Sequence, residues 1–206
     1  MHQEADPAWL LSLYRTTDKR HLILQSNNHD SSEQYLLDEG GPTLLKPRER
    51  GLEYYLDTQG DRVLVKSNRD GAMGLYQAPS LAQVAAGPWQ PLWSGEGREL
   101  EKWRLFAHHT VLQYRKAGDD WLDVLDAGGK LTHRLALTEG VGTAWIQGSQ
   151  DPAGARVLIR RQGMAEAPHQ RWLDLSSGTW SQGQAASSSP YRSERRWVVG
   201  RDGVRV

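Results

Sequence analysis

Short runs of apolar and β-branched residues recur along this chain in groups of four, and turns rich in Gly, Asp and Asn separate the runs. Such runs favour β-strands, and the turn residues favour tight reversals because Gly adopts positive φ and Asn and Asp bond their own backbone. The groups repeat every 40–50 residues or so, which is the repeat length of a four-stranded propeller blade. A β-sandwich would not group its strands in fours. The sequence therefore predicts an all-β fold, a partial β-propeller of about four four-stranded antiparallel blades.

The expected strands follow directly from these runs and turns. In three of the groups the third strand ends in Asp just before a turn, at Asp38, Asp126 and Asp174. Residues 81–86 could form a helical turn or two in an otherwise β-rich chain. The predicted strands lie at 9–14, 21–25, 34–37 and 43–45; 52–56, 62–66, 75–77 and 89–93; 100–106, 110–115, 121–125 and 131–137; and 142–147, 156–161, 170–175 and 179–182.

Charge and composition exclude several classes of partner. Lys and Arg (25) balance Asp and Glu (25), so we expect neither nucleic acid nor a membrane surface as a partner. No apolar run approaches the 18 or so residues of a membrane span, and the first residues are acidic where a signal peptide is basic. Cysteine is absent, which fits a reducing compartment and predicts a cytoplasmic location.

No motif for catalysis is found in the chain. The nucleophile elbow G-x-S-x-G does not occur, and Ser94 and Ser181 stand in near matches that we interpret as turns. None of the seven His lies in an H-E-x-x-H pattern, and His108 and His109 fall in a predicted hairpin turn, so no metal is expected. No Gly-rich phosphate loop appears, so no cofactor is expected either. The nine Trp could form a sugar-stacking platform, but packing between blades is the simpler interpretation.

A series of short motifs, in one order along the chain, resembles oligopeptidase B of the prolyl oligopeptidase family. They include an acidic E-x-D, a double Ser followed by Glu, an R-x-x-G-x-E-Y segment and a G-D-R turn. The closing residues Tyr191 and 193–204 resemble the family's exit from its propeller. In this sequence the first four motifs are Glu4-Ala5-Asp6, Ser31-Ser32-Glu33, Arg48 to Tyr54 and Gly60-Asp61-Arg62.

The resemblance implies both an architecture and a function. Residues 1–190 would form about the last four blades of a seven-bladed propeller, and 191–206 would lead toward an α/β-hydrolase catalytic domain that holds the Ser, Asp and His outside this chain. Such a propeller gates access of short peptides to an enzyme that cleaves after basic residues, so this chain alone should be inactive. The matching motif places Arg48, Arg50 and Glu53 near the substrate channel or the domain interface. Two alternatives stay open: a solvated turn for the charged loop around Arg48, and a free-standing propeller that acts as a binding or scaffold module.

Overall fold

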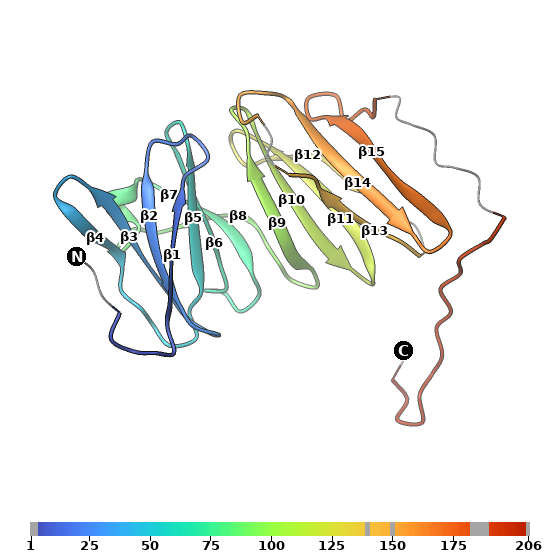
Figure 1. Cartoon of the computed structure of the whole chain (residues 1–206), viewed down its shortest axis with the longest axis horizontal. Coiled ribbons are helices and arrows are strands. Elements are labelled where there is room, and N and C mark those ends of the chain that lie inside the picture. The colour runs from blue at the N-terminus through green and yellow to red at the C-terminus, as the bar shows by residue number, and fades with distance from the viewer. Residues whose placement is uncertain (1–3, 139–140, 149–150, 182–189, 205–206) are drawn as a thin grey trace.

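The computed structural model describes residues 4–138, 141–148, 151–181 and 190–204, and these form four antiparallel sheets that follow one another along the chain (Figure 1). Each sheet is a meander in which consecutive strands pair, and this confirms the predicted blades. The strands are β1 (Leu10–Arg15), β2 (Leu22–Asn27), β3 (Ser32–Asp38) and β4 (Gly41–Lys46); β5 (Tyr54–Gln59), β6 (Arg62–Ser67), β7 (Gly74–Ala78) and β8 (Gln90–Trp93); β9 (Glu99–Leu105), β10 (His109–Lys116), β11 (Asp119–Asp126) and β12 (Leu131–Ala136); and β13 (Thr143–Ile146), β14 (Arg156–Gly163) and β15 (Glu166–Asp174).

The last sheet differs from the prediction in its fourth strand. Three strands pair in the order β13-β14-β15, and in place of a full strand at 179–182 there is a single antiparallel bridge between Leu173 and Trp180. Two backbone bonds flank this bridge, from Asp174 N to Thr179 O (2.9 Å) and from Ser181 N to Trp172 O (2.8 Å). The chain therefore returns to the sheet edge but pairs over only three residues, and Gln182 lies outside the described residues.

Two local predictions are corrected in detail. The helical turn within 81–86 is a 3-10 helix of three residues, Leu81–Gln83. His109 lies at the start of β10 and is half-buried, so it is not a turn residue, whereas His108 before it is exposed. No helix among the described residues is long and apolar enough to cross a bilayer.

The recurring Asp at the end of the third strand organises the turn that follows it. Asp38 Oδ1 accepts the N–H of Gly40, and Asp126 Oδ1 accepts the N–H groups of Gly128 and Lys130. Asp174 Oδ1 accepts the N–H groups of Ser176 and Ser177. Because a carboxylate satisfies N–H groups that the turn leaves without backbone partners, the same residue type recurs at the same place in three sheets.

The core consists of three apolar clusters, and each joins two consecutive sheets. Trp89 closes the first cluster against Tyr54 and Tyr76, with ring centroids 6.2 and 6.1 Å away. In the second cluster Trp93 packs on Tyr114 at 5.4 Å. Packing between blades is therefore confirmed for Trp93, whereas Trp89 packs on tyrosines of its own sheet within the cluster that joins the first and second sheets. Trp172 and Trp197 are exposed.

A buried carboxylate ties the second sheet to the third. Asp123 of β11 is fully buried and accepts hydrogen bonds from the indole N–H of Trp93 (2.9 Å) and the hydroxyl of Tyr114 (3.1 Å). The guanidinium of Arg134 binds the same carboxylate with two bonds of 2.8 Å, and Arg98 lies 3.6 Å away. Trp93 belongs to β8, so this network spans the boundary between the two sheets.

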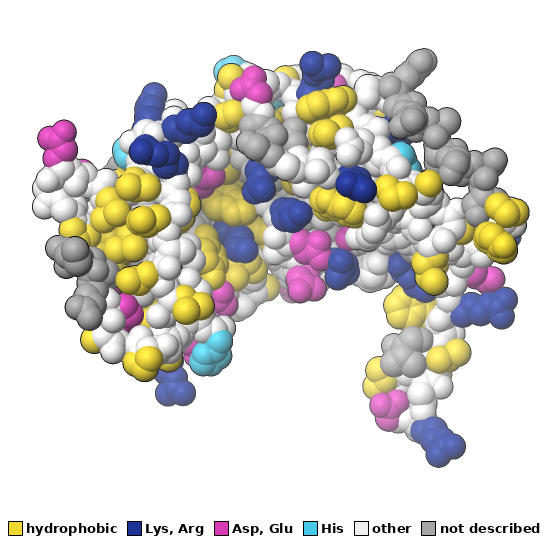
Figure 2. Space-filling model, viewed as in Figure 1, with side chains coloured by type: hydrophobic (Ala, Val, Ile, Leu, Met, Phe, Trp, Pro, Cys, Tyr) yellow, Lys and Arg dark blue, Asp and Glu magenta, His cyan; other side chains and the backbone are white. Residues whose placement is uncertain are grey.

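The first sheet leaves one apolar face without a covering sheet. Tyr14 and Ile23 pack toward the second sheet, while Leu11, Leu13 and Leu44 point the other way and are 42–60% exposed. Figure 2 shows hydrophobic side chains gathered over this part of the molecule. An exposed blade face is what an incomplete propeller predicts.

The C-terminal segment returns to the third sheet. Its residue Arg195 donates hydrogen bonds to the carbonyls of Ala117 (3.4 Å) and Gly118 (2.7 Å) at the turn between β10 and β11, and it pairs with Asp119 at 3.1 Å. Ala117 and Gly118 both have positive φ, which turns these carbonyls toward the guanidinium at a tight hairpin. Residues 190–204 contain no strand of the four sheets.

Candidate functional site

Residues of the first strands of the first three sheets, with Lys66 of β6, line a groove that we call the inner groove. It consists of two adjoining hollows of about 420 and 720 Å³, which share Asp57 and Arg104. Side chains of β1, β5 and β9 line the first hollow, and the second continues to the segment after β13, at Asp151 and Pro152. Residues of three sheets and of the loop after β13 therefore meet at one continuous site, and each hollow has a size usual for ligand pockets.

Charged side chains of both signs dominate the lining of this inner groove. The basic members are Arg15, Lys19, Lys66, Lys102 and Arg104, and the acidic members are Glu53, Asp57, Glu101 and Asp151. Apolar surface comes mainly from Tyr14, Tyr55 and Trp103. Such a lining can bind backbone amides, charged side chains and chain termini of an extended peptide by polar contacts. The described residues that line the groove include no Ser, Cys or His.

The resemblance predicts Glu53 near the substrate channel or the domain interface, and the structure places it in the inner groove. Its Oε2 accepts a hydrogen bond from the hydroxyl of Tyr55 (2.9 Å), and the Lys66 ammonium lies 5.1 Å from the Tyr55 ring centroid. Burial, followed by the bond to Glu53, raises the pKa of Tyr55 to about 12. Burial also lowers the pKa of Lys66, although Glu53 opposes this change. These three residues form a connected polar group on one wall.

Asp57 connects the two hollows and also joins the first sheet to the second. Its two oxygens accept the N–H of Thr17 (2.7 Å) and the Thr17 hydroxyl (2.6 Å), and Oδ1 accepts the N–H of Thr58 (2.8 Å). Burial raises the pKa of Asp57 and outweighs these bonds, which favour the ionised form. Tyr14 adds a second tie between the sheets, from its hydroxyl to Leu56 O at 2.7 Å. The groove wall is therefore fixed where β1 meets β5.

Arg48 and Arg50 lie away from the inner groove. They line a separate hollow of about 490 Å³ beside Trp9, His29 and Asp30. The structure thus separates these two arginines from Glu53, although all three belong to one sequence motif.

Arg48 is occupied by contacts within the first sheet and its N-terminal segment. Its guanidinium binds Glu33 (2.7 Å) and Glu4 (2.8 Å) and lies 3.9 Å from the centroid of the Trp9 ring. The bond from Arg48 holds the pKa of Glu4 at about 2, and bonds from Arg48 and Tyr35 lower the pKa of Glu33 although burial opposes them. Arg50 is exposed and makes no polar contact within the described residues.

Arg62 is a residue whose role the sequence reasoning missed. It donates a hydrogen bond to Thr110 Oγ1 (3.1 Å) and another to the carbonyl of Phe106, so it joins the second sheet to the third. Burial lowers the pKa of Arg62. The G-D-R turn was the signal available in the sequence, because it places a long basic side chain at the start of β6. Within the described ranges, no group of three or more His, Asp or Glu is arranged to hold a metal ion.

Comparisons with known proteins agree on one family. The model of the prolyl oligopeptidase N-terminal β-propeller domain matches residues 1–162. Dipeptidyl aminopeptidase BI of Pseudoxanthomonas mexicana is 24% identical over 98% of this chain, and a prolyl endopeptidase-like protein of Gallus gallus is 25% identical over 61% of it. The chain spans 29% of the length of the first of these relatives and 18% of the second.

Solved structures give the same fold. Oligopeptidase B from Trypanosoma brucei, in its closed form with bound antipain, superposes with a TM-score of 0.76 at 22% identity. Oligopeptidase B from Leishmania major superposes with a TM-score of 0.77 at 16% identity. Each match covers 99% of this chain and 32% of the compared chain.

Proposed function

The chain belongs to the prolyl oligopeptidase family, within its N-terminal β-propeller domain, and we propose that it forms part of a wall that admits short peptides to a catalytic domain. The observation that carries this proposal is the inner groove, to which the first strands of three sheets and the segment after β13 contribute. If further blades and the catalytic domain enclosed this groove, it would exclude folded proteins by size and keep bulk water from the reacting bond.

The catalytic partner in this proposal is an α/β-hydrolase domain of the same polypeptide. It would supply Ser, His and Asp, with the serine forming an acyl-enzyme and the histidine acting as base. Residues 1–190 would be the blades, and 191–206 would lead the chain toward this domain. Residues 205–206 lie outside the described part of that segment. A G-x-S-x-G motif in the continuation of the reading frame would support this partner, and a reading frame without one would refute it.

We propose cleavage after basic residues as the specificity. The acidic side chains of Glu53, Asp57 and Glu101 support it, because each carboxylate can pair with a basic side chain of the peptide, although basic residues of the same hollow balance their charge. The names of the relatives suggest other specificities, dipeptide release and cleavage at proline. The intact enzyme is given arginyl, prolyl and dipeptidyl substrates of equal length, and its cleavage rates distinguish the three specificities. A preference for prolyl substrates would refute the proposed cleavage after basic residues.

In this proposal the residues predicted near the channel or the domain interface have two different roles. Glu53 would face the passing peptide, whereas Arg48 and Arg50 would act at the domain interface or the rim of the propeller. We propose a cytoplasmic site of action, in keeping with a sequence that has no cysteine.

Chemical blocking of the groove tests the gating role. In the intact enzyme, Lys102→Cys places a thiol in the groove wall, and Thr132→Cys places one on β12 at an exposed position as the matched control. A bulky maleimide at position 102 should lower kcat/KM for an arginyl hexapeptide several-fold, whereas the same label at 132 should leave it unchanged. Equal effects at the two positions would contradict a substrate path through the groove. The chain itself contains no other thiol.

A further inference from the structure

The boundary between the third and fourth sheets is packed differently from the other two. At the first boundary Trp89 is 7% exposed, and at the second Trp93 is 6% exposed, so a tryptophan in or beside β8 closes each one. At the third boundary the corresponding residue is Trp180, which is only half-buried. A cavity of about 130 Å³ remains beside it. This inter-blade cavity shares no residue with the inner groove.

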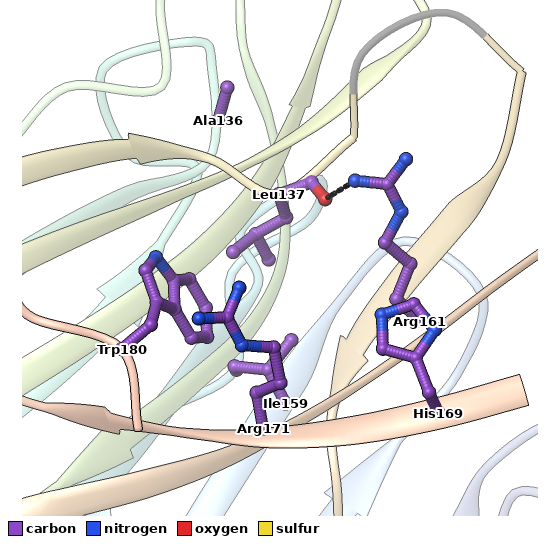
Figure 3. Close-up of a pocket in the computed structure, with 7 residues that line it drawn as sticks. All are labelled: Ala136, Leu137, Ile159, Arg161, His169, Arg171 and Trp180. Atoms are coloured by element: carbon purple, nitrogen blue, oxygen red, sulfur yellow. Dashed lines mark hydrogen bonds between the residues drawn. The ribbon is translucent and has the colours of Figure 1, made fainter. Parts of the chain in front are cut away.

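Two arginines and a histidine surround an apolar floor in the inter-blade cavity. Figure 3 shows Arg161 and His169 on one side, Arg171 and Trp180 on the other, and Leu137 and Ile159 between them. Leu137 and Ile159 belong to the apolar cluster that joins the third and fourth sheets. The cavity therefore offers an apolar surface with positive charge at its edges.

The charges around the inter-blade cavity are not balanced within the described residues. Glu166 binds Arg161 Nε at 3.0 Å and lies 3.5 Å from His169 Nδ1, so it serves both groups. Arg171 donates its Nε–H to the carbonyl of Ser181 (3.2 Å), and its guanidinium lies 5.4 Å from the Trp180 ring centroid. Among the residues that the structure describes, Arg171 has no carboxylate partner. A guanidinium at the mouth of a cavity can bind a carboxylate with two parallel hydrogen bonds.

We propose that the inter-blade cavity binds a small carboxylate that carries a flat apolar group. The carboxylate pairs with Arg171, and the apolar group lies against Leu137, Ile159 and Trp180. An apolar cavity of about 150 Å³ accommodates a benzene ring, so this cavity of about 130 Å³ would take most of such a ring and leave the carboxylate at the mouth beside Arg171. The proposal does not depend on the function of the inner groove.

Benzoate is the probe, and benzamide is its neutral counterpart of the same shape. We titrate the 206-residue chain with each compound and follow the indole N–H resonances of the 15N-labelled protein. Benzoate should bind with a Kd on the order of 1 mM, as expected of a ligand of about nine heavy atoms. Benzamide should bind about tenfold more weakly, because it lacks the charge-assisted bond. Equal binding of the two compounds, or no saturable change with benzoate, would overturn the proposal.

Two arginine variants distinguish a specific site from non-specific binding of an anion to surface arginines. Arg171→Gln should weaken benzoate binding about tenfold. Arg156→Gln is the matched control, because Arg156 also lies over a tryptophan of the same sheet, 5.6 Å from the Trp172 ring, but outside the cavity. Both arginines are exposed, and circular dichroism verifies that each variant is folded. Loss of binding in both variants, or in neither, would refute the site. Inorganic phosphate that binds as tightly as benzoate would refute the role of the apolar floor.

Discussion

Removal of the Asp123 carboxylate should destabilise the boundary between the second and third sheets more than removal of any exposed charged side chain. Asp123→Ala leaves the indole N–H of Trp93 and the hydroxyl of Tyr114 without their acceptor, and both side chains are buried. An unsatisfied buried donor costs about 1–3 kcal/mol. Arg134 is 45% exposed and can turn to water, so its lost ion pair adds less.

The expected loss is therefore about 3–5 kcal/mol of unfolding free energy, the range seen when one partner of a buried ion pair is removed. At an m-value of about 2 kcal/mol/M, the urea midpoint should fall by about 1.5–2.5 M with m unchanged. The assay is urea denaturation followed by tryptophan fluorescence and by circular dichroism, since coincident curves justify the two-state treatment.

Asp126→Ala in the same strand is the matched control. Asp126 accepts two turn N–H groups at the exposed end of β11, and its loss should cost about 1 kcal/mol. The reasoning would be refuted if Asp123→Ala shifted the midpoint no further than Asp126→Ala. A double-mutant cycle with Trp93→Phe should also show coupling, because the indole N–H and the carboxylate share one bond across the sheets.

Three further predictions concern other parts of the chain. Arg48→Gln should lower the thermal midpoint at neutral pH. The depressed pKa values of Glu4 and Glu33 give stability that is present above about pH 4.5 and is lost as the pH falls toward 2, so the two melting curves should converge in acid. Gly178→Ala should destabilise more than Gly60→Ala in thermal melts. Both glycines have positive φ, but a Cβ at 178 would lie 2.6 Å from His133 Nδ1, whereas at 60 it meets open space. The purified chain should not hydrolyse arginyl substrates in a fluorogenic peptidase assay, and turnover would contradict the absence of a nucleophile motif.

Much of the fold could be predicted because strand and turn signals are local. Asp126, for example, follows an apolar run and precedes Gly128 and Gly129, so the end of β11 is visible in the sequence alone. The last strand of the fourth sheet was overestimated, because Thr179 to Ser181 has strand-like composition but pairs at a single bridge. Strand composition does not reveal how far the pairing extends.

The candidate site was harder to predict because its contacts join distant parts of the chain. Glu53 lies in the inner groove, whereas Arg48, five residues earlier, binds Glu4 and Glu33 in the N-terminal segment and the first sheet. The groove itself depends on Asp57 and Thr17 meeting across two sheets, 40 residues apart. No spacing rule in one sequence indicates such a pair.

The attachment of Arg195 has a mechanical consequence. Because its guanidinium binds the Ala117–Gly118 turn and Asp119, part of any tension applied to the C-terminal segment is delivered to the hairpin of β10 and β11. The third blade thus shares a load that the order of the sequence alone would assign to the fourth. A pull on the end of the chain would have to break these bonds before residue 195 could move away from the third blade.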